Sequence, residues 1–267
     1  MESTLSLTKA ELEVMVADFL GWGPGTQSEG QAWEDADTNK VRKVRELVKA
    51  GVHRFYYPFV PGMLGTYEWS FLQPVAALTF ASDATTVELP DDYGGLHGKI
   101  TVSTSDSATF IPLEFVHEGV IRAEFAKSPD ASGRPMLASE QVLKGTETTR
   151  GQRFQLYLFP AADQDYTLTV PYKITPNALT GLRPICYGGA WHAETIRESC
   201  LAVAEHTLYD KAGIHTELFN QRLLASIGMD QAHKPHKLGY NADHSHGLHN
   251  SRFERQDVVV TVNGVTP

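Results

Sequence analysis

Residues 153–174 read RFQLYLF, PAADQD and YTLTVPYKI, which are two apolar runs joined by a turn-forming link. Aromatic and β-branched residues with alternating polarity favour strands over 153–159 and 166–174. The short link Pro160–Asp165 is typical of the connection between antiparallel neighbours. The sequence therefore predicts a pair of adjacent strands here.

Four earlier runs extend this β region toward the N-terminus. Each is bounded by turn residues, as strands usually are. They cover Val75–Phe80, Thr85–Leu89, Lys99–Ser103 and Phe110–Val116. Short strands at such spacing predict an antiparallel β-sandwich or partial barrel, which we assign to residues 61–184.

The segment 1–60 before this β region carries two helical patterns. The first begins at Thr8, where Glu11 completes a capping box and Leu7 faces Leu12 as a hydrophobic staple, and it ends at Gly21. In the second helix, apolar residues recur at three- and four-residue steps. They are Val41, Val44, Leu47, Val48, Val52 and Phe55.

The segment 185–231 after the β region returns to a helical period. One helix, closed by Gly213, buries a stripe of apolar residues, and a second helix follows. The stripes are Ile196, Cys200, Val203, Ala204 and Leu208, then Leu218, Leu223, Leu224 and Ile227. A short link predicts that the two helices pack antiparallel and against the N-terminal pair. The expected fold is α+β, a helical bundle with an inserted β domain.

Residues 232–267 form a polar segment that we expect to be an extended C-terminal arm. It contains Arg252 and Arg255 and finishes with the β-prone run DVVVTV, residues 257–262. Such a strand is suited to adding onto the sheet edge of a partner. We therefore predict that both arginines and four apolar residues of the run bind a partner. The four are Val258, Val259, Val260 and Val262.

Composition limits the classes of function. The chain has 267 residues, of which 42% are hydrophobic and 21% charged, as in globular proteins. Its 23 Lys and Arg against 32 Asp and Glu give a net charge of −9, which argues against a surface that coats nucleic acid. Neither a signal peptide nor a membrane-spanning apolar run is expected, and Cys186 and Cys200 are too few for a disulfide framework.

The carboxylates and histidines do not form a known catalytic or metal-binding motif. Asp163 and Asp165 suit turn capping, and the carboxylates at 194, 198 and 205 suit a solvated helix face. Either set could instead serve a hydrolase. The histidines of segment 233–249 have loose spacing, so a polar tail is favoured over a metal site and their role stays open. We expect no enzyme activity, catalytic residue, metal or cofactor.

A basic cluster lies on the second helix. Lys40, Arg42 and Lys43, with Arg45 and Lys49, could touch a nucleic acid or an acidic protein, or could form a solvated face. The aromatic residues 55–57 and 59 that follow suit either the core or an interface.

Three further aromatic residues support a second class of function. Trp69, Tyr93 and Trp191 could stack on a ligand, as in a β-sandwich that binds a carbohydrate or a protein.

The order of these segments resembles that of the head-tail adaptor, or connector, proteins of tailed bacteriophages, including the tail tubular and gatekeeper types. LPDDYGG at 89–95 is similar to the turn that enters their β domain. QLYLFPAAD at 155–163 and YTLTVPY at 166–172 are similar to their paired strands, and AETI at 193–196 to the start of the next helix.

The resemblance implies a structural protein of the virion, made in the host cytoplasm and placed between head and tail. Roughly twelve copies would form a ring beneath the portal protein. DNA would pass through its channel without a tight grip, because the chain is acidic. The lower face would meet a nozzle, stopper or tail tube protein, and the C-terminal arm would reach the portal.

Overall fold

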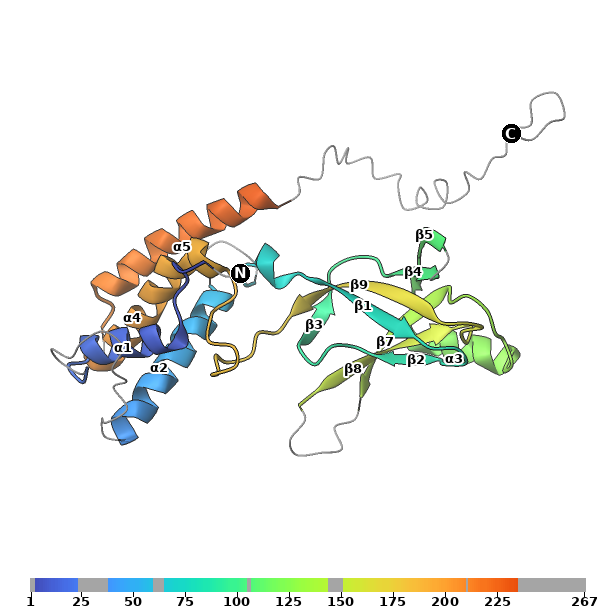
Figure 1. Ribbon diagram of the computed structural model, residues 1–267, viewed down its shortest axis with the longest axis horizontal. Coiled ribbons are helices and arrows are strands. Elements are labelled where there is room, and N and C mark those ends of the chain that lie inside the picture. The colour runs from blue at the N-terminus through green and yellow to red at the C-terminus, as the bar shows by residue number, and fades with distance from the viewer. Residues whose placement is uncertain are drawn as a thin grey trace, which may run out of the picture. The chain divides into compact units, whose positions relative to one another are not determined.

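The computed structural model describes residues 3–23, 38–59, 65–104, 107–143, 151–209 and 211–234. Within these ranges the chain folds into a bundle of four helices and a β body of two sheets, so the predicted α+β class is confirmed (Figure 1). From residue 235 onward the predicted arm, with Arg252, Arg255 and the valines of 258–262, lies outside the described residues.

The N-terminal helices form where the sequence predicts them. Helix α1, Lys9–Phe19, begins with the expected capping box, in which the Thr8 amide donates to Glu11 Oε2 at 2.7 Å and the Glu11 amide donates to Thr8 Oγ1 at 3.3 Å. Gly21 follows the helix with a φ of 70°, a conformation that favours glycine. Helix α2 spans Thr38–Tyr56 and buries the predicted apolar stripe except Val41, which is half-buried.

The C-terminal helices form the predicted hairpin. Helix α4, Ala193–Tyr209, follows the short 3-10 helix Gly189–His192, and α5 spans Ile214–His233, beyond the boundary predicted at 231. Two predicted core residues are wrong, because Leu208 is 44% exposed in the last turn of α4 and Leu224 is 62% exposed. Adjacent helical residues point about 100° apart, so burial of Leu223 turns Leu224 outward.

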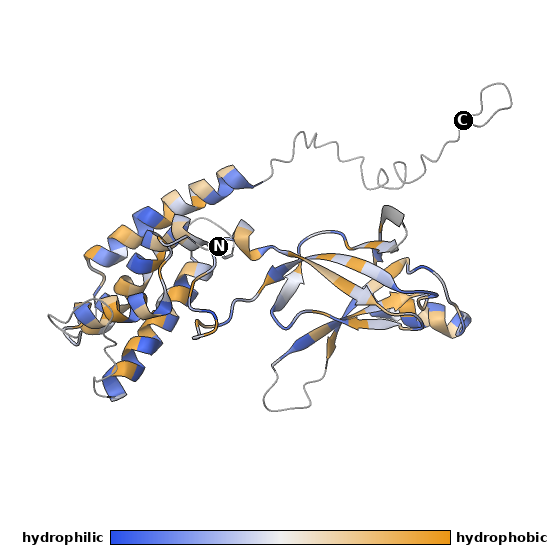
Figure 2. Ribbon diagram, viewed as in Figure 1, coloured by the Kyte–Doolittle hydropathy of each residue, from blue (hydrophilic) through white to orange (hydrophobic). Residues whose placement is uncertain are grey.

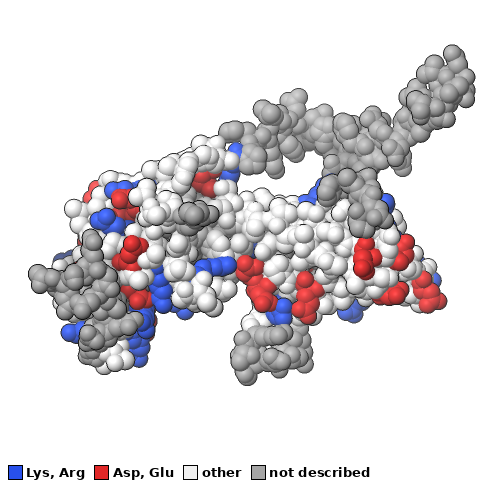
Figure 3. Space-filling view, viewed as in Figure 1, with Lys and Arg blue, Asp and Glu red and all other residues white. Residues whose placement is uncertain are grey.

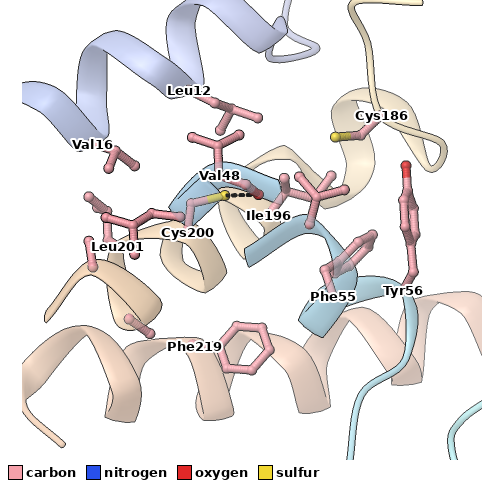
Figure 4. Packing of buried hydrophobic residues seen from close by; sticks show 14 of the residues in the cluster. Leu12, Val16, Val48, Phe55, Tyr56, Cys186, Ile196, Cys200, Leu201 and Phe219 are labelled. Carbon is pink, nitrogen blue, oxygen red and sulfur yellow. Dashed lines mark hydrogen bonds between the residues drawn. The ribbon is translucent and has the colours of Figure 1, made fainter. Parts of the chain in front are cut away.

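All four bundle helices share one hydrophobic core. Side chains from α1, α2, α4 and α5 converge there, among them Leu12, Val48, Ile196 and Phe219 (Figure 4). Helix α4 approaches α2 closely at Cys200, whose Sγ lies 3.8 Å from the Val48 carbonyl oxygen. Both ends of the described chain therefore build one core, and the β body is inserted between them.

The β body contains two sheets. The first has the order β1-β9-β4-β5, with β3 also paired to β9, and the second has the order β2-β8-β7-β6. The strands of the first are β1 Val75–Phe80, β3 Tyr93–Leu96, β4 Thr101–Thr104, β5 Ser107–Pro112 and β9 Tyr166–Ile174. Those of the second are β2 Thr86–Glu88, β6 Glu114–Phe115, β7 Leu137–Leu143 and β8 Arg153–Phe159.

Strands β8 and β9 have the predicted bounds, but the prediction that they pair with each other is wrong. Strand β8 lies between β2 and β7, whereas β9 pairs with β1, β3 and β4. The link between them crosses from one sheet to the other, and Ala162 within it is fully buried. A link of this length can close a hairpin or join two sheets, so its length did not decide the pairing.

The two sheets enclose a second core. Along β8 and β9 the alternate residues Leu156, Leu158, Leu168 and Val170 are fully buried in it. Figure 2 shows the corresponding alternation of apolar and polar residues in the β body. Burial of one side of each sheet against the other is the arrangement of a sandwich.

Several elements of the β body depart from the prediction. Strands β6 and β7 pair in parallel, against the expected antiparallel pattern, and the predicted run 110–116 is divided between β5 and β6 at Leu113. Strands β3 and β7 were not predicted. Helix α3, Glu118–Lys127, was also missed, because it buries only Ile121 fully and lacks a long apolar stripe.

None of the helices within the described ranges is both long enough and apolar enough to cross a membrane.

Candidate assembly surfaces

The predicted basic residues Lys40, Arg42 and Lys43 lie exposed on α2, with Arg45 and Lys49. Their ion pairing is weak: Arg42 Nε lies 4.0 Å from Glu46 Oε1, and both side chains are more than half exposed. Lys40 Nζ lies 5.9 Å from the centre of the Trp22 ring. In Figure 3 basic side chains gather over α2. We call this surface, residues 40, 42, 43, 45 and 49, the α2 basic face.

A hollow of about 220 Å³ adjoins this face, between α1, α2 and residues 176–179. Its apolar lining comes from Val48, Val52, Tyr56 and Leu179. The cationic part of its lining is Lys9, Arg45 and Lys49. We call it the α1–α2 hollow.

One carboxylate, Glu13, lies in this hollow and is 5% exposed. Its Oε1 is 3.5 Å from Lys9 Nζ and 3.6 Å from Arg45 Nε. Three cationic side chains thus face one carboxylate, so the hollow combines an apolar lining with a net positive rim. This combination suits a bulky apolar side chain accompanied by carboxylates.

A second hollow lies beside the 3-10 helix Gly189–His192. It is lined by Phe71, Trp191, His192, Met229 and Asp230, among others. The Asp230 carboxylate accepts hydrogen bonds from the Tyr67 hydroxyl at 2.7 Å and from Ser70 Oγ at 2.5 Å. Burial lowers the pKa of His192, against an opposing effect of Asp230 that raises it, which favours a neutral ring.

The aromatic residues proposed to stack on a ligand are mostly in the cores. Trp69 is 1% exposed and donates from Nε1 to the Phe55 carbonyl at 3.0 Å. Tyr93 is 5% exposed and donates to Glu140 Oε2 at 2.9 Å. The ligand-stacking roles of Trp69 and Tyr93 are therefore wrong, and of the three only Trp191 is exposed.

The sequence allowed the aromatic residues after the basic face to lie either in the core or at an interface, and the structure places some in each environment. Phe55 and Tyr56 are buried in the bundle core, and Tyr57 is half-buried. Phe59 is 78% exposed, so it alone of the four remains suited to an interface.

The carboxylates of α4 have separate structural roles. Glu194 pairs with Arg222 at 2.7 Å, and buried Glu198 lies 2.8 Å from His215 Nδ1. Glu205 caps the start of α5, where it accepts from the Thr216 amide at 3.2 Å. They do not converge on one site.

Asp163 and Asp165 lie in the link between β8 and β9, but their hydrogen bonds are not the capping of their own backbone that the sequence predicts. Asp163 accepts from the Tyr166 hydroxyl at 2.6 Å, and Asp165 accepts from the Ser82 amide at 2.9 Å. The described residues contain no group of three or more His, Cys, Asp or Glu side chains that could hold a metal ion. Most of the His-rich segment lies outside the described residues.

One surface was missed from the sequence. At the short edge strand β6, Phe115 is 51% exposed, and Met136 beside it is 54% exposed. Glu114 and Asp130 lie exposed nearby in the chain. The sequence EFVHEGV, 114–120, alternates acidic and apolar residues, which could have indicated this surface. The prediction of a single strand over 110–116 hid that pattern. We call residues 114, 115, 130 and 136 the β6 edge.

Comparisons with known proteins add no assignment. No protein-family model matches the chain, and a search of curated proteins gave no significant match.

Proposed function

We propose that the protein is a structural head-tail adaptor of a tailed bacteriophage virion. Roughly twelve copies form a ring between the portal protein and the tail. The observation that carries the proposal is the single bundle core that α1 and α2 build together with α4 and α5, with a β-sandwich inserted in the chain between the two helix pairs. This is the arrangement that the order of sequence segments shares with the adaptor family.

The surfaces support a protein that makes several contacts. Exposed large apolar residues lie on separate elements, including Phe115 at the β6 edge, Trp191 before α4 and Ile214 at the tip of the α4–α5 hairpin. A subunit in a ring between two other proteins needs separate surfaces for its neighbours and for each partner. The portal and a nozzle, stopper or tail tube protein would be those partners.

The charge balance suits a channel through which DNA moves. The net charge of −9 disfavours extensive phosphate contacts, since each contact needs a cation. The α2 basic face is too local to coat a duplex. DNA would therefore be in transit rather than bound.

The proposal is tested by negative-stain microscopy and mass photometry of the full chain, alone and mixed with the portal protein of the same phage. We expect rings with a central opening, either alone or on the portal. A chain that stays monomeric and ignores the portal would refute the proposal.

A matched variant that ends after Lys234 tests the role of the arm. We expect its circular dichroism spectrum and melting temperature to equal those of the full chain, because both described cores are retained. Binding to the portal should fall. Loss of folding in this variant would contradict a division between folded body and binding arm.

A further inference from the structure

The bundle and the β body carry surfaces of opposite charge. The α2 basic face has five cations within ten residues of one helix. In the described part of the β body acidic residues outnumber basic ones, and Figure 3 shows acidic side chains gathered over it. Lys43 and Lys49 on one side, and Glu114 and Asp130 on the other, make no ion pair within the described ranges.

The two surfaces also match in their apolar parts. The walls of the α1–α2 hollow include the apolar side chains of Val48, Val52 and Leu179. At the β6 edge, Phe115 and Met136 are both more than half exposed, and the Glu114 amide donates to the Met136 carbonyl at 2.9 Å, which brings the two chain segments together. This edge thus has two large exposed apolar side chains, and the exposed Glu114 precedes Phe115 directly in the chain. A hollow with a cationic rim is complementary to it.

We infer that, in the assembled ring, the α1–α2 hollow and α2 basic face of one copy receive the β6 edge of the next copy. This inference rests on the proposed function and names the residues that join its subunits. The contact is heterologous, because one copy offers the hollow and its neighbour offers the edge. Repetition of such a contact around an axis closes a ring.

A second copy fits these surfaces better than a nucleic acid does. Phosphates would use the cations of α2 but would leave the apolar hollow unfilled. Nucleic acid would also leave the exposed Phe115 and Met136 without a role. The acidic edge would repel phosphates, whereas a neighbouring chain satisfies both surfaces at once.

The test is a charge exchange between the two surfaces. Variant one carries Lys43→Glu and Lys49→Glu, and variant two carries Glu114→Lys and Asp130→Lys. Each alone places like charges across the contact, so the concentration needed for half-assembly should rise at least about tenfold. An equimolar mixture should assemble again, because every face then meets an edge of opposite charge in an alternating ring. Mass photometry measures both.

The control variant carries Lys99→Glu and Lys211→Glu, which change net charge as variant one does but at exposed positions outside the contact. It should assemble like the wild type. Circular dichroism should show that all variants are folded, because every substituted side chain is exposed.

The outcomes separate this inference from the adaptor proposal. Wild-type rings together with unimpaired variants would overturn the inference and leave the adaptor proposal standing. Impaired variants that the mixture does not restore would also overturn it, because the surfaces would then meet something other than each other. Loss of duplex DNA binding in variant one, with assembly unchanged, would assign the α2 basic face to nucleic acid. Wild-type monomers that ignore the portal would refute the adaptor proposal itself.

Discussion

Replacement of Gly51 by alanine should open the contact between α2 and α4. A Cβ atom at Gly51 would lie 2.5 Å from Cys200 Cα and 2.9 Å from the Cys200 backbone nitrogen. Backbone atoms cannot turn away as a flexible side chain can, so the helices must move apart. The hydrogen bond from Ser199 Oγ to the Gly51 carbonyl, 2.7 Å long, lies at the same crossing and would be stretched.

Two opposing free-energy terms decide the size of the effect. Overpacking of a core costs about 1 to 3 kcal/mol and occasionally more, and a stretched buried hydrogen bond adds about 1 kcal/mol. Alanine regains up to about 1 kcal/mol through its higher helix propensity. The net expectation is a loss of about 2 kcal/mol in the free energy of unfolding. Urea unfolding followed by circular dichroism at a fixed protein concentration measures it.

The matched control is Gly228→Ala in α5, where a Cβ atom would meet nothing within 4 Å. This variant should gain about 0.5 to 1 kcal/mol from helix propensity alone. The same substitution should thus have opposite signs at the two sites. A Gly51→Ala variant as stable as the control would refute the close approach of α2 and α4.

Three further substitutions test single interactions. Asp230→Ala should cost about 3 kcal/mol in urea unfolding, since it removes the buried carboxylate that accepts from the Tyr67 hydroxyl and from Ser70 Oγ, whereas Asp230→Asn should cost less. Glu205→Ala should cost about 1 to 2 kcal/mol through the lost cap of α5, whereas the exposed Glu194→Ala should change the melting temperature little. Burial raises the pKa of Cys186 from 9.0 to about 11, so its contribution to stability is complete below pH 9 and is lost as the pH rises through 11. At about pH 10 the wild type should lose about 1 kcal/mol that a Cys186→Ala variant keeps, and a pH-independent difference between the two would contradict the shift.

Elements with strong local signals could be predicted from the sequence. The capping box at Thr8 fixed the start of α1, and the periodic stripe of α2 fixed its buried face. Strands β8 and β9 have the bounds that their alternation predicts. In each case the information lies within a few residues of the element, where side-chain chemistry and period act directly.

Pairing and partial burial could not be predicted, because both depend on residues far away in the chain. Strand β9 pairs with β1 and β4, which end more than sixty residues before it in the chain. It does not pair with β8, although only a six-residue link separates the two strands. Helix α3 packs on β8 through contacts of Phe125 with Tyr157 and Phe159. The short sequence of α3 alone does not indicate these contacts.

The candidate site divides in the same way. The exposed cations of α2 follow from helical period, since the apolar stripe of α2 must face the core and turns Lys40, Arg42 and Lys43 outward. The α1–α2 hollow could not be predicted, because Leu179 reaches it from a loop that follows the whole β body.

The chain passes twice between the bundle and the β body, and we call these two connections the chain crossings. The inferred contact makes both crossings important for assembly. If a neighbour binds the bundle through one surface and the β body through another, ring closure depends on how the crossings are held. The first is anchored where the Trp69 ring packs against Phe55 at 4.9 Å between ring centres, and the second where the Tyr187 amide donates to the Tyr56 hydroxyl at 2.8 Å. Both anchors use the last turn of α2, the helix that also carries the basic face. The run of aromatic residues after that face therefore ties the cationic surface to both crossings, so a change there would alter assembly even where the fold survives.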